Sequence, residues 1–167
     1  FAIGSLEKAL KAIETGAFQA EIAPVTLQSR SGEVTVDTDE QPGNARIDKI
    51  RSLRPAFKKD GTVTAANSSS ISDGGSALVL MRESDAQQRG LKPLARIVAH
   101  STHAQLPAEF TIAPIGAINK VLQRAGWSKD EVDLYEINEA FAVVSLLAIS
   151  ELGLDAGKVN VNGGACA

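Results

Sequence analysis

The second half of the chain alternates short apolar runs with longer helical patterns. The runs at 94–99, 132–137 and 159–161 have the length and composition of buried strands. Between them lie helical patterns at 115–125 and 139–152, each followed by a glycine that can end the helix. Strands joined through helices run parallel and are connected by right-handed crossovers. This order predicts an α/β layered fold.

The first half predicts more varied local structure. Apolar residues at helical spacing predict a helix over 5–15. The Ser31-Gly32 pair predicts a hairpin between strands at 21–27 and 33–36. The elements expected after the hairpin are a short helical piece at 47–53, a loop of small residues at 61–76, a buried strand at 77–81, a helix at 83–89 and a domain junction at 90–93.

The bulk composition excludes several classes of partner. Of the 167 residues, 44% are hydrophobic and 22% are charged, which is typical of a soluble globular protein. A net charge of −3 without a run of Lys or Arg gives no electrostatic footprint for nucleic acid or an anionic membrane. The apolar stretches are also too short to span a bilayer. We therefore expect neither a nucleic acid nor a membrane as partner.

Few residues of this chain are suited to nucleophilic or metal chemistry. Cys166 is the single cysteine, which is compatible with a reducing compartment. It has no neighbouring histidine to activate its thiol, so we interpret it as a small buried filler. The two histidines, His100 and His103, have no further ligands nearby in the sequence, and no metal site is expected.

Asn138 stands where the predicted strand at 132–137 gives way to a helix, a position at which α/β proteins place functional side chains. One interpretation is that it caps the helix, with Glu139 complementing the helix dipole. The other is that its carboxamide faces a cavity and holds a water or a substrate oxygen. The Gly163-Gly164 pair is similarly open to two interpretations, a structural turn or a close backbone approach to a ligand.

Four motifs, read together, resemble consecutive landmarks of the thiolase family. In order along the chain they are RPAF (54–57), GTVTAANSSSISDGGSALVLM (61–81), NEAFA (138–142) and NVNGGA (160–165). The opening stretch, FAIGSLEKALKAIETGAFQAEIAPV, resembles the end of the family's loop domain. The resemblance implies part of a thiolase-like αβαβα fold, with the end of the CoA-binding loop domain at 1–60, the last segment of the N-terminal domain at 61–92 and the first part of the C-terminal domain at 93–167.

The resemblance implies that the chain is a segment of an acyl-CoA acetyltransferase. Thiolases condense acetyl-CoA to acetoacetyl-CoA, or run the reverse thiolysis, through an acyl-cysteine. A second cysteine acts as acid and base. Their substrates are coenzyme A thioesters, and no cofactor or metal is implied. Family members are commonly homodimers or homotetramers, and a bacterial-type member would be cytoplasmic.

The resemblance also assigns roles to individual residues. Asn138 would be the catalytic asparagine, whose bound water forms an oxyanion hole together with a histidine. Phe57, Ala65 and Ser69 would contact the adenine and pantetheine of CoA. Phe141 would line the acyl end of the pocket.

The sequence departs from the family pattern in two ways. After Asp39-Glu40-Gln41-Pro42, Gly43 and Asn44 stand where the family commonly has an arginine near the nucleotide, and Arg46 is the candidate substitute. The nucleophilic cysteine would precede Phe1, and the histidine and base cysteine would follow Ala167. We therefore expect the chain alone to be inactive. The alternative is a non-catalytic thiolase-like CoA-binding or scaffold subunit. A ketoacyl synthase is disfavoured because those enzymes use paired histidines in place of the NEAFA asparagine.

Overall fold

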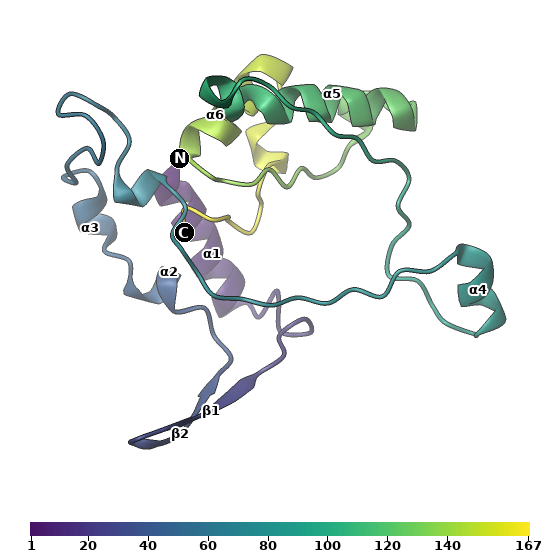
Figure 1. Cartoon of the computed structure of the whole chain (residues 1–167), viewed down its shortest axis with the longest axis horizontal. Helices are drawn as coiled ribbons and strands as arrows, with labels where there is room; N and C mark the ends of the chain where they lie inside the picture. The colour runs from purple at the N-terminus through teal and green to yellow at the C-terminus, as the bar shows by residue number, and fades with distance from the viewer.

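The computed structural model describes all 167 residues, and helices make up most of its regular structure (Figure 1). The α-helices are α1 (Ala2–Glu14), α2 (Glu40–Asn44), α3 (Ile47–Ile50), α4 (Glu83–Gln88), α5 (Ala113–Ala125) and α6 (Ala142–Leu152). Short 3-10 turns lie at η1 (Ala65–Asn67), η2 (Pro107–Ile112), η3 (Lys129–Glu131) and η4 (Ala156–Lys158). None of the helices combines the length and apolarity needed to traverse a lipid bilayer.

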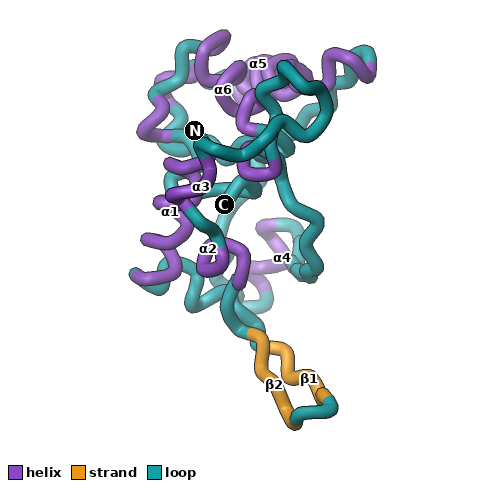
Figure 2. Tube along the Cα trace, turned by 90° about the vertical axis from the view of Figure 1, so that its left-hand side faces the viewer, coloured by secondary structure: helices purple, strands orange, loops and turns teal.

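Two strands, β1 (Val25–Ser29) and β2 (Gly32–Val36), form the expected hairpin. They pair antiparallel from Val25 opposite Val36 to Ser29 opposite Gly32, and Gly32 has a φ of 118° that suits glycine at the turn. Every residue of both strands is exposed. The hairpin projects away from the rest of the molecule in two perpendicular views (Figures 1 and 2).

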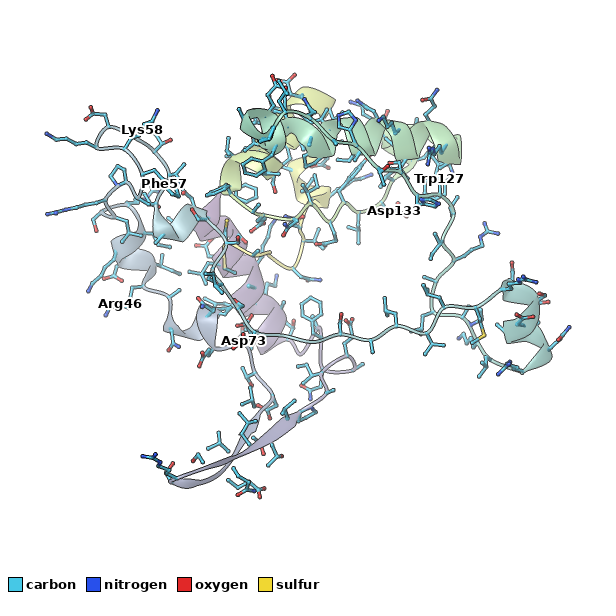
Figure 3. All side chains as sticks on the ribbon, viewed as in Figure 1. Arg46, Phe57, Lys58, Asp73, Trp127 and Asp133 are labelled. Carbon is cyan, nitrogen blue, oxygen red and sulfur yellow. The ribbon has the colours of Figure 1, made fainter.

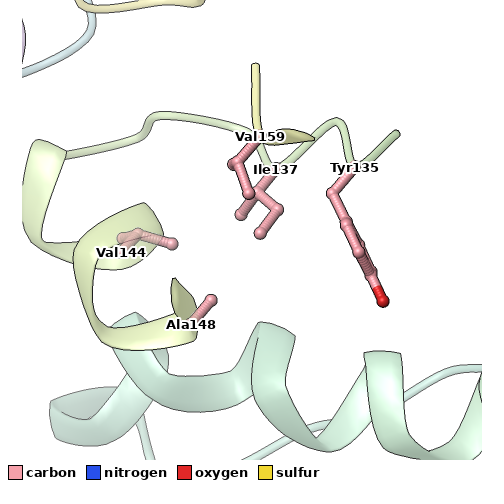
Figure 4. Close-up of a cluster of buried hydrophobic side chains, with 5 residues drawn as sticks. All are labelled: Tyr135, Ile137, Val144, Ala148 and Val159. Carbon is pink, nitrogen blue, oxygen red and sulfur yellow. The ribbon is translucent and has the colours of Figure 1, made fainter. Parts of the chain in front are cut away.

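The hydrophobic core lies in the C-terminal third of the chain (Figure 4). Tyr135 and Ile137 come from the extended segment before α6, Val144 and Ala148 come from α6, and Val159 follows η4. Helix α5 packs along α6 and covers this cluster. Both helices end at a glycine in the left-handed conformation, Gly126 after α5 and Gly153 after α6, as their sequences predicted.

Helix α1 joins the N-terminal part of the chain to this core. Its apolar face buries Leu6 and Ala12, and its polar residue Ser5 is also buried. The ammonium group of Lys8 donates a hydrogen bond of 3.0 Å to the carbonyl of Val159. The first residues of the chain are thus held against a segment about 150 positions away, and α1 belongs to the same packing unit as the core.

The predicted strands of the α/β layer are extended but mostly unpaired. The segments at 77–81 and 94–99 form no strand, and Leu78 and Leu94 are 84% and 102% exposed. A strand requires a neighbour that completes its hydrogen-bond ladder. The one pairing in the predicted layer is a parallel bridge between Tyr135 and Val159, on either side of α6. Its direction agrees with the predicted crossover.

Hydrogen exchange should separate the paired from the unpaired segments. The amide of Tyr135 donates to the carbonyl of Lys158 at 2.8 Å, and that of Asn160 donates to the carbonyl of Tyr135 at 2.9 Å. The amides of 77–81 have no backbone partner. We expect slow exchange at Tyr135 and Asn160 and fast exchange over 77–81, measured by mass spectrometry of peptides from this chain. Equal protection of the two regions would contradict this arrangement.

Candidate active site

Asn138 lies in a short loop between the core segment ending at Ile137 and the start of α6. A pocket of about 440 Å³ opens beside it. The walls are mostly apolar side chains from η2, α5 and α6, and the polar lining residues are Asn138, Glu136 and His103. The Asn138 side chain is exposed and forms no hydrogen bond with the rest of the chain. Its carboxamide is therefore free to bind a ligand or a water.

The structure shows that Asn138 does not cap α6. The helix begins at Ala142, and its N-cap is Phe141, whose backbone is extended with φ −143° and ψ 151°. The capping interpretation was therefore wrong, and α6 starts three residues later than predicted. The physical reason is that the side chain of Glu139 is buried in contacts with distant segments, which keep the backbone extended past Asn138.

Phe141 does not line the pocket itself but packs against Phe110, which does. Its ring packs against Phe110 with centroids 6.0 Å apart and planes tilted by 59°, a favourable aromatic geometry. Phe110, from η2, lines the pocket directly. Sequence reasoning did not identify Phe110, because a single aromatic residue in an irregular stretch gives no periodic signal.

The loop of small residues predicted over 61–76 runs beside the Asn138 loop. Ser68 forms an antiparallel bridge with Phe141, and the amide of Ser69 donates a hydrogen bond of 3.1 Å to the carbonyl of Ala140. The loop is shaped by Asn67, whose carboxamide accepts from the amide of Thr64 at 2.8 Å. The NEAFA and TAANSS motifs are thus neighbours in space as well as landmarks in sequence.

A second pocket, of about 340 Å³, lies on the other side of the 65–70 loop. Ala65 and Ser68 line it, and Arg46 and Lys49 contribute its cationic side chains from the α3 region. Arg46 also forms an exposed ion pair with Asp48, with N and O 3.4 Å apart. The positive charge of this pocket is suited to an anionic ligand.

The remaining predicted CoA contacts lie at the edge of this region. Phe57 is 76% exposed and lines neither pocket, although it lies on the same side of the molecule as Arg46 (Figure 3). Ser69 is exposed and is placed by its hydrogen bond to Ala140 rather than by a pocket wall. The structure therefore groups Asn138 with Phe141 and Ser69, places Ala65 in the second pocket, and leaves Phe57 apart from both pockets.

Cys166 lies at the second pocket and is half-buried. Burial raises the pKa of its thiol from the ordinary value of 9.0 to about 11, and the negative charge of nearby Glu139 adds to the effect. The thiol is therefore protonated near neutral pH and is a poor nucleophile. Nowhere in the structure do three His, Cys, Asp or Glu side chains gather in a metal-binding arrangement.

Two protein-family models match almost all of this chain. The N-terminal domain model of thiolase matches residues 1–84, and the C-terminal domain model of thiolase matches residues 91–167. The chain belongs to the thiolase family. The fold is accordingly a partial thiolase-like α/β fold.

Other thiolases resemble the chain over its full length. It is 47% identical to the acetyl-CoA acetyltransferase of Yarrowia lipolytica over 167 residues and 50% identical to a probable acetyl-CoA acetyltransferase of Dictyostelium discoideum over 168 residues. The alignments cover 100% of this chain but only 42% and 41% of those proteins. The chain thus spans well under half the length of these relatives.

Solved thiolase structures show the same correspondence. The acetyl-CoA acetyltransferase of Bacillus anthracis superposes with a TM-score of 0.94 at 47% identity, and covers 99% of this chain and 42% of its own. The Acat5 thiolase of Ascaris suum, solved in complex with coenzyme A, superposes with a TM-score of 0.91 at 41% identity over the same shares. These scores show that the chain shares its backbone fold with solved thiolases over nearly its whole length.

Alkylation can test the environment of Cys166. Because its pKa is about 11, iodoacetamide should react with it slowly at pH 7–8 and progressively faster toward pH 11. The raised pKa also makes the stability of the fold depend on pH. Its contribution to stability is present below pH 9.0 and is lost as the pH rises from 9.0 toward 11. Mass spectrometry of the alkylated peptide measures the rate. A fast reaction at pH 7 would contradict a buried, protonated thiol.

Proposed function

We propose that this thiolase segment takes part in acetyl transfer between coenzyme A thioesters. In the forward direction two molecules of acetyl-CoA give acetoacetyl-CoA and CoA, and thiolysis reverses the reaction. The observation that carries the proposal is the free carboxamide of Asn138 at the wall of an apolar pocket. Further support comes from relatives named acetyl-CoA acetyltransferase and from a relative solved with coenzyme A.

Asn138 would act on the charge that develops during the reaction. Formation of the enolate or of a tetrahedral intermediate places negative charge on the thioester oxygen. The carboxamide oxygen of Asn138 can accept a hydrogen bond from a water, whose other hydrogen then points to that oxygen. Such a donor is most effective where it is pre-oriented and where apolar walls limit competition from bulk water. The walls beside Asn138 are of that kind.

The second pocket would hold the other end of the substrate. Coenzyme A carries phosphates at its nucleotide end, and Arg46 and Lys49 supply positive charge there. Phe57, Ala65 and Ser69 would contact the adenine and pantetheine, as the resemblance implies. Coenzyme A thioesters would be substrates, and no other cofactor is proposed.

The thiolase would function as a homodimer or homotetramer. The apolar side chains exposed on the segments at 77–81 and 94–98 favour this proposal, because such surfaces are ordinarily covered by neighbouring chain segments or subunits. A cytoplasmic location is proposed on the resemblance to bacterial-type members.

Substitution of Asn138 tests its proposed role. In the protein expressed from its native gene, Asn138→Ala should lower kcat for acetoacetyl-CoA thiolysis about 100- to 1000-fold, the usual effect of removing one oxyanion donor. The assay follows the loss of the absorbance of the acetoacetyl-CoA enolate. Asn119→Ala, at an exposed position of α5, is the matched control and should leave kcat unchanged. Unchanged turnover in Asn138→Ala would contradict the oxyanion role assigned to Asn138.

Substitution of Arg46 tests the proposed phosphate contact. Because Arg46 is exposed, Arg46→Ala should raise KM for CoA only about 2- to 5-fold, with little change in kcat. The increase should shrink at high salt, since exposed charges are screened. Arg30→Ala, in the hairpin turn, is the control and should leave KM unchanged. An equal change in both variants would contradict a specific contact.

A second candidate, a non-catalytic CoA-binding thiolase subunit, rests on the pocket lined by Arg46 and Lys49, which needs no catalytic group to bind CoA. Calorimetric titration with CoA and the thiolysis assay, both on the protein expressed from its native gene, separate the two. Binding without turnover favours the subunit, and turnover favours the enzyme.

A further inference from the structure

Glu139, the residue after Asn138, is an acidic side chain that is almost completely buried. Only 1% of its surface is exposed, and no lysine, arginine or histidine pairs with it. A carboxylate in such a place is costly unless hydrogen-bond donors replace its water. Its neighbours should therefore all be donors.

Three donors from two segments, α1 and 160–166, surround the carboxylate. Oε2 accepts from the hydroxyl of Ser5 in α1 at 2.7 Å and from the amide of Cys166 at 3.1 Å. Oε1 accepts from the side-chain amide of Asn160 at 2.8 Å. The hydroxyl of Ser5 in turn accepts from the amide of Gly164 at 3.0 Å. A single charge thus connects α1, the Asn138 loop and the segment at 160–166.

Asn160 also fixes the backbone on the other side of Asn138, at Ile137. The side-chain oxygen of Asn160 accepts from the amide of Ile137 at 2.8 Å, and its side-chain nitrogen donates to the carbonyl of Ile137 at 2.8 Å. Its second hydrogen goes to Glu139. Asn138 therefore stands between two anchored residues, although its own side chain has no partner within the chain.

The glycine pair, Gly163 and Gly164, allows the segment at 160–166 to approach Glu139 and α1 closely. A Cβ on Gly164 would lie 2.5 Å from Cδ of Glu139, and a Cβ on Gly163 would lie 2.5 Å from the carbonyl oxygen of Ser5. Gly163 also has a φ of 84°. No larger residue fits at either position without displacing the carboxylate or α1.

From this geometry we propose that Glu139 is a positioning residue, which orients Asn138 for its action on the substrate oxygen. The proposal rests on the function proposed above, because it acts through Asn138. Glu139 does not contact the pocket; it holds the Asn138 loop in register with α1 and with the glycine pair. The charge of Glu139 matters because a glutamine in its place would point its NH2 group at a hydrogen-bond donor instead of accepting from it.

Kinetics of the protein expressed from its native gene test the proposal. Glu139→Gln should lower kcat about 10- to 100-fold, the effect of displacing an oriented group by about 1 Å, with KM for CoA changed less than about 2-fold. Ser5→Ala removes the hydrogen bond that α1 donates to the Glu139 carboxylate, and should lower kcat about 3- to 10-fold. Thr15→Ala is the control, because Thr15 also makes a side-chain hydrogen bond to α1 but does not contact Glu139 or Ile137. It should leave kcat within about 2-fold.

A double-substitution cycle separates positioning from general stability. In the Asn138→Ala background, Glu139→Gln and Ser5→Ala should lower kcat by less than about 2-fold further, because the group that they orient is already gone. If the losses multiply instead, or if KM alone changes, Glu139 is not a positioning residue. Should Glu139→Gln fail to fold, as judged by circular dichroism, the Ser5→Ala cycle decides. An inactive wild type would instead overturn the proposed function, so failure of that function and failure of the positioning role give different results.

Discussion

A buried carboxylate holds the folded part of this chain together. Glu139 lies 134 positions from Ser5 and 27 positions from Cys166, and its Oε2 accepts a hydrogen bond from each of them. Removing a charge from water is unfavourable, and these hydrogen bonds offset the cost only if all three segments are in place together. The requirement couples helix α1, the Asn138 loop and the glycine pair into one cooperative unit. By contrast, the hairpin and α4 have no such connection and project from it (Figure 1).

Local patterns predicted those elements whose cause is local. Helical spacing indicated α1, α5 and α6, and alternating Val and Thr around a tight turn indicated the β1–β2 hairpin. The glycines after α5 and α6 ended both helices as expected. The strands of the layer were recognisable as apolar runs, but their pairing depends on neighbours and was not determined by their own sequence. One parallel bridge, between Tyr135 and Val159, shows the predicted direction.

The candidate site was harder to predict because its contacts are distant in sequence. By local rules Glu139 would complement a helix dipole and Asn138 would cap the helix, yet burial of Glu139 delays the helix to Ala142. The glycine pair was open to two interpretations, and the structure adds a third. Gly163 and Gly164 make a close backbone approach, but to Ser5 and Glu139 of the same chain rather than to a ligand. No pattern of spacing contains that information.

The charge of Glu139 has a second chemical consequence, because it also acts on Cys166. It accepts the hydrogen bond of the Cys166 backbone amide and, after burial, contributes to the rise in the pKa of the thiol to about 11. A thiolate at this position would be a much stronger nucleophile than the protonated thiol. Burial and the Glu139 carboxylate together therefore keep the one cysteine of this chain protonated near neutral pH.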